Sequence, residues 1–188
     1  MTLTEFLAWE ERQEMRYEFD GIQPVAMTGG TVQHEVIGDT LRGLLRAALR
    51  GKPCRSLGPT MKIQTNDRIR YPDAFVYCMP VAANETVIRA PVVVFEVLSP
   101  GTSRIDRIEK LRDYQATASI RRYVILEQSS MAAMVFTRQG ESWNAQALTG
   151  IDTLHMPEIE VDLPLADIYA DTGLTPTDGV VATDPPPA

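Results

Sequence analysis

The sequence predicts an α/β domain whose core runs in the order helix, three strands, helix, strand. Three observations lead to this prediction. Residues 31–50 repeat apolar side chains at helical spacing, residues 91–98 form a β-branched run typical of a buried strand, and residues 104–118 return to helical spacing. A chain of 188 residues, 44% of them hydrophobic, suits one domain with a sizeable core.

The amino-terminal half supplies the first elements. A short helix at residues 3–15 precedes a hairpin of residues 17–20 and 23–27, with Gly21 in its turn. The long helix at 31–50 follows two glycines that break the chain and ends at Arg50 and Gly51, a favourable cation and a stop. The strands of the core are expected at residues 55–64, 69–77, 91–98 and 121–127.

The carboxyl-terminal part extends this core. Residues 131–137 and 142–148 predict a second hairpin at the far edge, and residues 151–170 predict a short strand and a helix. Residues 171–188 are rich in Pro, Asp, Thr and Gly and hold too few large apolar side chains to order themselves. We therefore expect a single domain over residues 1–170 and a flexible tail.

Composition excludes several classes of protein. No apolar run approaches the roughly 20 residues that span a bilayer, and the first residues lack the basic start and apolar centre of a signal peptide. A cytoplasmic protein without membrane contact is expected. Cys54 and Cys78 are the only cysteines; one disulfide is arithmetically open, but in a reducing compartment we expect two free thiols. With only His34 and His155 beside them, no zinc-ligand spacing exists.

Two acids stand where a strand should be apolar. Glu96 interrupts the run 92–98, on the same face as Val92 and Val94, and a buried carboxylate is costly unless a cation meets it. Asp73, directly after Pro72, is likewise an acid among the apolar residues of the preceding strand. Two carboxylates from neighbouring strands are a common way to hold Mg²⁺. The alternative is a pair of unrelated acids, one of them satisfied by Arg70.

Lys110 lies at the edge of the apolar stripe of the second helix. At 3.6 residues per turn it stands about 40° from Tyr114, so it can reach over the end of the sheet toward the two acids. The alternative is a solvated lysine paired with Asp106 or Asp113. Arg104 and Arg107 on the same helix can point to water or to a phosphate backbone, and a turn at residues 99–101 allows Thr102 or Ser103 to cap this helix.

Two weaker site candidates precede these residues. His34 lies in the first turn of the long helix, where an imidazole could bond a phosphate or a water, or could simply anchor the helix. Glu18 alternates with two aromatic residues and could face the site, but a solvent-facing strand acid is the favoured interpretation.

The segments PDAFVYC, VVVFEVLSP and the following helix resemble the Uma-two family of predicted endonucleases. The resemblance includes YEFDG at 17–21 and His34, and covers roughly residues 1–140. It implies a restriction-endonuclease-like core of the PD-(D/E)XK superfamily. Asp73 matches the aspartate of the PD element and Glu96 the glutamate of the E-V-L-S element, both metal ligands in the superfamily. Leu98 replaces the usual lysine two residues after the glutamate, and Lys110 resembles a migrated replacement.

The resemblance implies a Mg²⁺- or Mn²⁺-dependent DNA endonuclease in which Asp73 and Glu96 bind the metal and Lys110 assists. The net charge of −7 argues against bulk electrostatic binding of nucleic acid, although residues 104–122 hold six cationic side chains against three acids. The alternatives are a catalytically weak or inactive module that binds DNA or protein, and an RNA or nucleotide phosphodiesterase. A homodimer paired along the hairpin at 131–148 is also expected.

Overall fold

The computed structural model describes residues 1–27, 29–98 and 104–176, and the side chains of residues 104–106 are not part of that description. The expected helix caps at Thr102 or Ser103 therefore lie outside the described residues, as do residues 177–188 of the expected tail. The Arg104 side chain, expected to contact phosphate, lies outside them as well.

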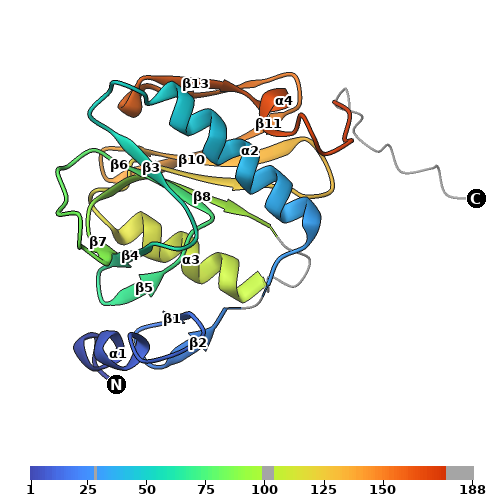
Figure 1. Cartoon of the computed structure of the whole chain (residues 1–188). Coiled ribbons are helices and arrows are strands. Elements are labelled where there is room, and N and C mark those ends of the chain that lie inside the picture. Colours follow the sequence, from blue (N-terminus) through green and yellow to red (C-terminus); the bar gives the residue numbers. More distant parts are fainter. Residues whose placement is uncertain (28, 99–103, 177–188) are drawn as a thin grey trace, which may run out of the picture.

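A mixed sheet forms the centre of the molecule, with α2 and α3 on its two faces (Figure 1). Its strand order is β11-β10-β9-β8-β6-β3, and β8 and β9 are parallel while the other neighbours are antiparallel. The bounds are β3 Arg55–Leu57, β6 Ala74–Tyr77, β8 Pro91–Val97, β9 Arg122–Leu126, β10 Ala132–Gln139 and β11 Ser142–Thr149.

The helix α2 (Val32–Ala48) begins where the sequence predicts, because Thr31 caps it by accepting a hydrogen bond from the His34 backbone N–H. Its apolar stripe of Ile37, Leu41 and Leu45 is fully buried. These side chains pack on one face of β8, while α3 (Arg104–Ala116) packs Tyr114 against the other face. The strand period of two thus places the even-numbered Glu96 on the α3 side.

The predicted core order is confirmed by α2, β3, β6, β8, α3 and β9. Two strand predictions are wrong in detail, because the expected strands at 55–64 and 69–77 each divide into two. Their other halves, β4 (Lys62–Thr65) and β5 (Arg68–Arg70), join a second sheet of order β2-β1-β5-β4-β7. Pro59 and Pro72 lie in the breaks, and proline cannot donate a ladder hydrogen bond.

The amino-terminal segment completes that second sheet. The helix α1 is shorter than expected and carries a capping box between Thr2 and Glu5. The predicted hairpin forms, with Gly21 at φ 93°, a conformation open to glycine. Phe19 of this hairpin pairs with Ile69 of β5, so the amino terminus lies beside the sheet. The bounds are α1 Leu3–Glu10, β1 Tyr17–Phe19, β2 Pro24–Ala26 and β7 Val87–Ile88.

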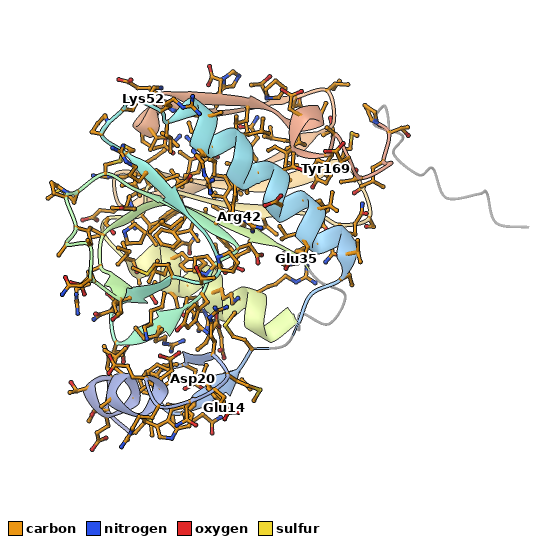
Figure 2. The ribbon with its side chains drawn as sticks, viewed as in Figure 1. Glu14, Asp20, Glu35, Arg42, Lys52 and Tyr169 are labelled. Carbon is orange, nitrogen blue, oxygen red and sulfur yellow. A yellow bond between two sulfur atoms is a disulfide. The ribbon has the colours of Figure 1, made fainter. Side chains whose placement is uncertain are left out.

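The carboxyl-terminal segment packs against α2 and shares the core on the α2 face of the main sheet (Figure 1). Tyr169, labelled in Figure 2, donates hydrogen bonds to the backbone oxygens of Glu127 and Ala132 and so ties this layer to the sheet. Leu174 continues the packing. The elements are β12 Thr153–Met156, the 3-10 helix Pro157–Ile159, β13 Val161–Pro164 and α4 Leu165–Ile168. None of the helices in the described parts of the chain could span a membrane.

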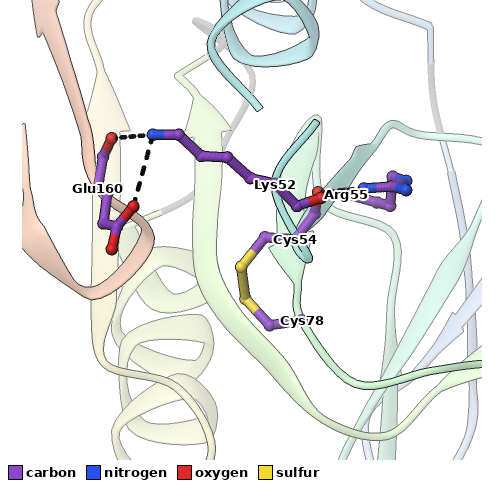
Figure 3. Close-up of a disulfide and its surroundings, with 5 residues drawn as sticks. All are labelled: Lys52, Cys54, Arg55, Cys78 and Glu160. Atoms are coloured by element: carbon purple, nitrogen blue, oxygen red, sulfur yellow. Dashed lines mark hydrogen bonds and ion pairs between the residues drawn. A yellow bond between two sulfur atoms is a disulfide. The ribbon is translucent and has the colours of Figure 1, made fainter. Parts of the chain in front are cut away.

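Cys54 and Cys78 form a disulfide, so the expectation of two free thiols is wrong (Figure 3). The register of β3 and β6 explains the pairing: Arg55 faces Tyr77, so the two cysteines are the next pair along the antiparallel strands. Their Cα atoms lie 3.9 Å apart. Position 54 stands 24 residues from position 78, and only the sheet brings them together.

Candidate nuclease site

Glu96 is the buried acid at the centre of the site. It lies near the end of β8 with 8% of its surface exposed. Its Oε1 atom accepts hydrogen bonds from the Tyr114 hydroxyl at 2.6 Å and from Lys110 Nζ at 3.3 Å. Burial raises the pKa of Glu96 to about 7, Lys110 opposes this shift, and the charges of Asp73 and Glu18 add to it. At neutral pH the Glu96 carboxyl group is therefore about half protonated.

Asp73 lies in the break between β5 and β6, where Pro72 ends the preceding backbone ladder. Its Oδ2 atom accepts the backbone N–H of Val97 at 2.7 Å, which fixes it to the strand that carries Glu96. His34 Nε2 lies 3.2 Å from the same oxygen. The two acids expected to converge are thus linked through one residue of β8, and the charge of Asp73 contributes to raising the pKa of Glu96.

Lys110 reaches the site from α3, as its place on the helix predicts. Its Nζ atom lies 3.3 Å from Glu96 and 3.6 Å from Glu18 Oε1, and 15% of its side chain is exposed. Of the two alternative partners, Asp113 is bound by Arg70 and Arg68, and the side chain of Asp106 lies outside the described residues. The lysine therefore bridges two buried acids from different sheets.

Glu18 is buried, so the expectation of a solvent-facing acid is wrong. Burial raises its pKa, but the charges of Lys110 and Arg70 outweigh burial and hold the pKa below the usual range. Its Oε1 atom accepts the backbone N–H of Tyr71, and its Oε2 atom accepts Arg70 Nη1 at 3.0 Å. Sequence alternation alone could not show that β1 packs against β5 and turns this side chain inward.

His34 acts on Asp73 in this structure. The hydrogen bond to Asp73 raises the pKa of His34, although burial opposes the shift. The Nδ1 atom is buried without a hydrogen-bond partner among the described residues, and a Cβ atom at Gly30 would lie 3.0 Å from it. The imidazole is therefore packed tightly, with its Nε2 atom directed at Asp73.

Tyr114 was not singled out as a site residue by sequence reasoning, although a signal was present. It stands four residues after Lys110, so the two side chains share one side of α3. Its ring belongs to the apolar core and contacts Tyr123 edge to face, while its hydroxyl reaches Glu96. Burial and the charge of Glu96 raise the pKa of Tyr114 well above its usual value, which keeps it a hydrogen-bond donor.

The donor set of Asp73 and Glu96 fits a hard divalent cation. Both supply carboxylate oxygens, and the repulsion between their charges is the kind that a cation relieves. Across the described side chains of residues 1–27, 29–98 and 107–176, no three His, Cys, Asp or Glu residues gather into a metal-binding group. A site with two protein carboxylates suits Mg²⁺, which keeps several waters of its own.

The expected cationic residues are distributed unevenly. Arg107 is exposed on α3 and stays a predicted phosphate contact. Arg122, counted in the positive stretch 104–122, is 7% exposed and binds Glu158 through Nε at 2.6 Å. The charge of Arg122 is therefore neutralised by Glu158 within the protein and is not directed at a ligand.

Comparison with known proteins agrees with the resemblance. Residues 3–166 match the family Uma2, described as "Putative restriction endonuclease". An uncharacterized protein of Synechocystis sp., slr1290, is 31% identical over 169 residues, which covers 88% of this chain and 89% of that protein. A crystal structure from Anabaena variabilis, described as a "putative nuclease belonging to DUF820", superposes with a TM-score of 0.76 at 16% identity, covering 90% and 98% of the two chains, and so shares the fold. The chain belongs to the Uma2 family.

Proposed function

We propose that this protein is a divalent-metal-dependent phosphodiester hydrolase that cuts DNA. The observation that carries the proposal is the placement of Glu96, a buried acid with a pKa raised to about 7, between Lys110 and the neighbouring Asp73. Such a group is costly in a purely structural role and useful in a metal site. Membership of a family described as restriction endonucleases supports the same reaction.

Asp73 and Glu96 would hold the metal through their carboxylate oxygens. A bound Mg²⁺ or Mn²⁺ supplies Lewis-acid polarisation of the scissile phosphate and a water of lowered pKa. The protein keeps both ligands oriented: the backbone N–H of Val97 and His34 Nε2 hold Asp73, and the Tyr114 hydroxyl holds Glu96. These contacts fix the carboxylates before substrate arrives.

Lys110 would contribute a positive charge where negative charge builds on the phosphate oxygens. Glu18 holds this ammonium group together with Glu96. We assign Glu18 as a residue that positions Lys110, and His34 as one that positions Asp73. Arg104 and Arg107 on α3 are the proposed contacts to more distant phosphates.

The test is a Mn²⁺ or Mg²⁺ titration of the parent protein, Glu96→Gln and Asp73→Asn by calorimetry, followed by incubation of the same samples with plasmid and single-stranded DNA. We expect the parent to bind metal and cut DNA, and each variant to lose both. Glu141→Gln, in the exposed turn between β10 and β11, is the matched control.

Each other result identifies one alternative. Metal binding without cleavage of DNA, with cleavage of RNA or a nucleotide diester, moves the substrate and keeps the site. Salt-dependent DNA binding without any product at any metal concentration indicates a module that has lost turnover. No metal binding at millimolar concentration refutes the proposal and leaves the paired acids as structural groups.

A homodimer is part of the proposal, because two sites can cut two strands of a duplex. The strand β11 lies at the edge of the six-stranded sheet and offers unpaired backbone groups for a second copy. Light scattering coupled to gel filtration measures the mass in solution. A mass of 20.9 kDa at the working concentration would mean that the protein acts as a monomer.

A further inference from the structure

A cavity of about 350 Å³ lies beside Arg42, whose guanidinium contacts the backbone oxygen of Asp73. One wall consists of Arg42 and Arg46, one turn apart on α2, and the other consists of residues 56–60 at the end of β3 and in the loop that follows. Ser56 and Thr60 add hydroxyl groups to this wall. Guanidinium and hydroxyl groups are the side-chain donors that contact phosphate oxygens in nucleic-acid complexes.

Arg42 joins this cavity to the candidate metal site. Its Nη1 atom donates a hydrogen bond to the backbone oxygen of Asp73 at 3.3 Å, so the guanidinium lies against the backbone of that acid. Gly58 permits the approach, because a Cβ atom there would come 2.6 Å from Arg42 Cδ and 3.5 Å from the Asp73 oxygen. A phosphate in the cavity would therefore lie next to the phosphate at the metal site.

The charges around Arg42 decide which side of it an anion would take. A second cavity, of about 610 Å³, is also lined by Arg42 but carries Glu35, Asp39 and Asp171, which repel phosphate. On the other side Arg46 is exposed and forms no ion pair within the described residues. The pairs of Arg42 with Glu35 and Asp39 are 3.9 and 3.5 Å long and solvent-exposed on the acid side, so they leave its charge available.

We propose that Arg42, Arg46 and the segment 56–60 form a binding subsite for the nucleic-acid phosphate that neighbours the scissile one. This inference rests on the proposed function for its substrate class, since it concerns the backbone of the same DNA strand. It also explains how a chain with a net charge of −7 can hold DNA: the positive surface is local and adjoins the site.

Arg46→Ala tests the subsite because this side chain forms no hydrogen bond or ion pair within the described parts of the chain. DNA binding is measured by fluorescence anisotropy in EDTA, where no metal-dependent cleavage occurs, between 50 and 200 mM salt. Losing one phosphate contact should make the fall of log K with log salt less steep by about 0.9. This corresponds to about an eightfold loss of affinity near 0.1 M salt. Arg12→Ala, an exposed arginine outside the cavity with the same charge change, should keep the parent slope.

A pair of glycine variants tests the cavity by shape instead of charge. Gly58→Ala places a methyl group against Arg42 and should also weaken DNA binding severalfold, whereas Gly43→Ala on α2 meets nothing within 4 Å and should not. Metal affinity, measured by calorimetry, should stay at the parent value in Arg46→Ala and in both controls, because none of these residues contacts Glu96.

Two results with these variants would overturn the subsite: an unchanged slope and affinity in Arg46→Ala, or an equal loss in Arg12→Ala. Absence of any DNA binding by the parent protein would overturn it as well. The proposed function fails separately. If the parent binds DNA through Arg46 but never cuts it with metal, the subsite stands and the hydrolase does not; if cleavage occurs and Arg46→Ala retains the parent affinity and slope, the reverse holds.

Discussion

Lys110 meets Glu96 from the helix that follows its strand, with Nζ 3.3 Å from Oε1. The position two residues after Glu96 is occupied by Leu98, whose side chain packs in the apolar cluster beneath α3. Lys110 on α3 thus takes the place beside Glu96 that a lysine at position 98 of the strand would otherwise take. This relationship makes the contribution of Lys110 testable by moving the charge between the two positions.

Lys110→Met should lower the rate of DNA cleavage by about 100-fold, the scale of losing one donor that stabilises transition-state charge. Leu98→Lys in the Lys110→Met background should recover part of that rate, because position 98 shares the sheet face of Glu96. Single-turnover cleavage of a labelled duplex measures both. Lys52→Met, whose lysine binds Glu160 instead, is the matched control. Full activity in Lys110→Met would refute the assignment.

The pKa of Glu96 predicts how stability depends on pH without metal. Its folded pKa of about 7 lies above the ordinary glutamate value of 4.5, so between these values the folded state binds more protons and stability falls as pH rises. The total loss is about 3 kcal/mol. Urea unfolding in EDTA at pH 5 and pH 8 should show Glu96→Gln gaining that much on the parent at pH 8 only. Parallel pH profiles would contradict the raised pKa.

His34 should titrate at a higher pKa than a free histidine because it bonds to Asp73. The stability that this bond adds is present below the ordinary pKa of about 6.5 and is lost as pH rises through the folded value. In Asp73→Asn the pKa of His34 should fall, and the Cε1 proton followed by NMR measures the change. The ring of His155, on β12, provides an internal reference in the same spectra. An unchanged titration of His34 would show that Asp73 does not hold the imidazole.

Arg70 is the largest fully buried side chain, it is charged, and we expect folding to require it. It is 2% exposed and bonds Glu18 and Asp113 through three nitrogen atoms. Arg70→Met removes the buried guanidinium between the two carboxylates and leaves Glu18 with Lys110 and Asp113 with Arg68 as their remaining cations. We expect a cost of about 3–5 kcal/mol in urea unfolding. Arg89→Met removes an exposed pair with Glu85 at i to i+4 spacing and should cost under about 1 kcal/mol. Similar losses in the two variants would mean that burial of the network contributes nothing.

The disulfide predicts that the purified protein, denatured without reductant, has no thiol that reacts with a thiol reagent, since Cys54 and Cys78 are its only cysteines. Replacing both by serine should lower the free energy of unfolding by about 3 kcal/mol, the scale expected for closing a loop of this length. Reductant should lower the parent's stability by a similar amount and leave the serine variant unchanged. Two reactive thiols per chain in protein purified without reductant would show that the bond does not form.

The sequence by itself determined the elements of the core and the acids within it. Periodicity located α2, β8, α3 and β9, because each buries one stripe or face that the residue pattern records directly. Glu96 was detectable because a carboxylate inside a β-branched run is costly wherever the strand packs. The position of Lys110 could be predicted from helical geometry, because the angle between it and its neighbours on α3 depends only on their spacing in the sequence.

The tertiary structure decided the contacts between segments that the chain does not relate locally. Strand alternation could not show that β1 packs on β5, so Glu18 was expected to face water and is instead buried against Arg70. The breaks at Pro59 and Pro72 lie where β4 and β5 leave for a second sheet, from which Arg70 contacts Glu18 and Asp113. The pairing of β3 with β6 brings the cysteines together. Side-chain period is a local property, while burial and partner depend on which surfaces meet after the sheets form.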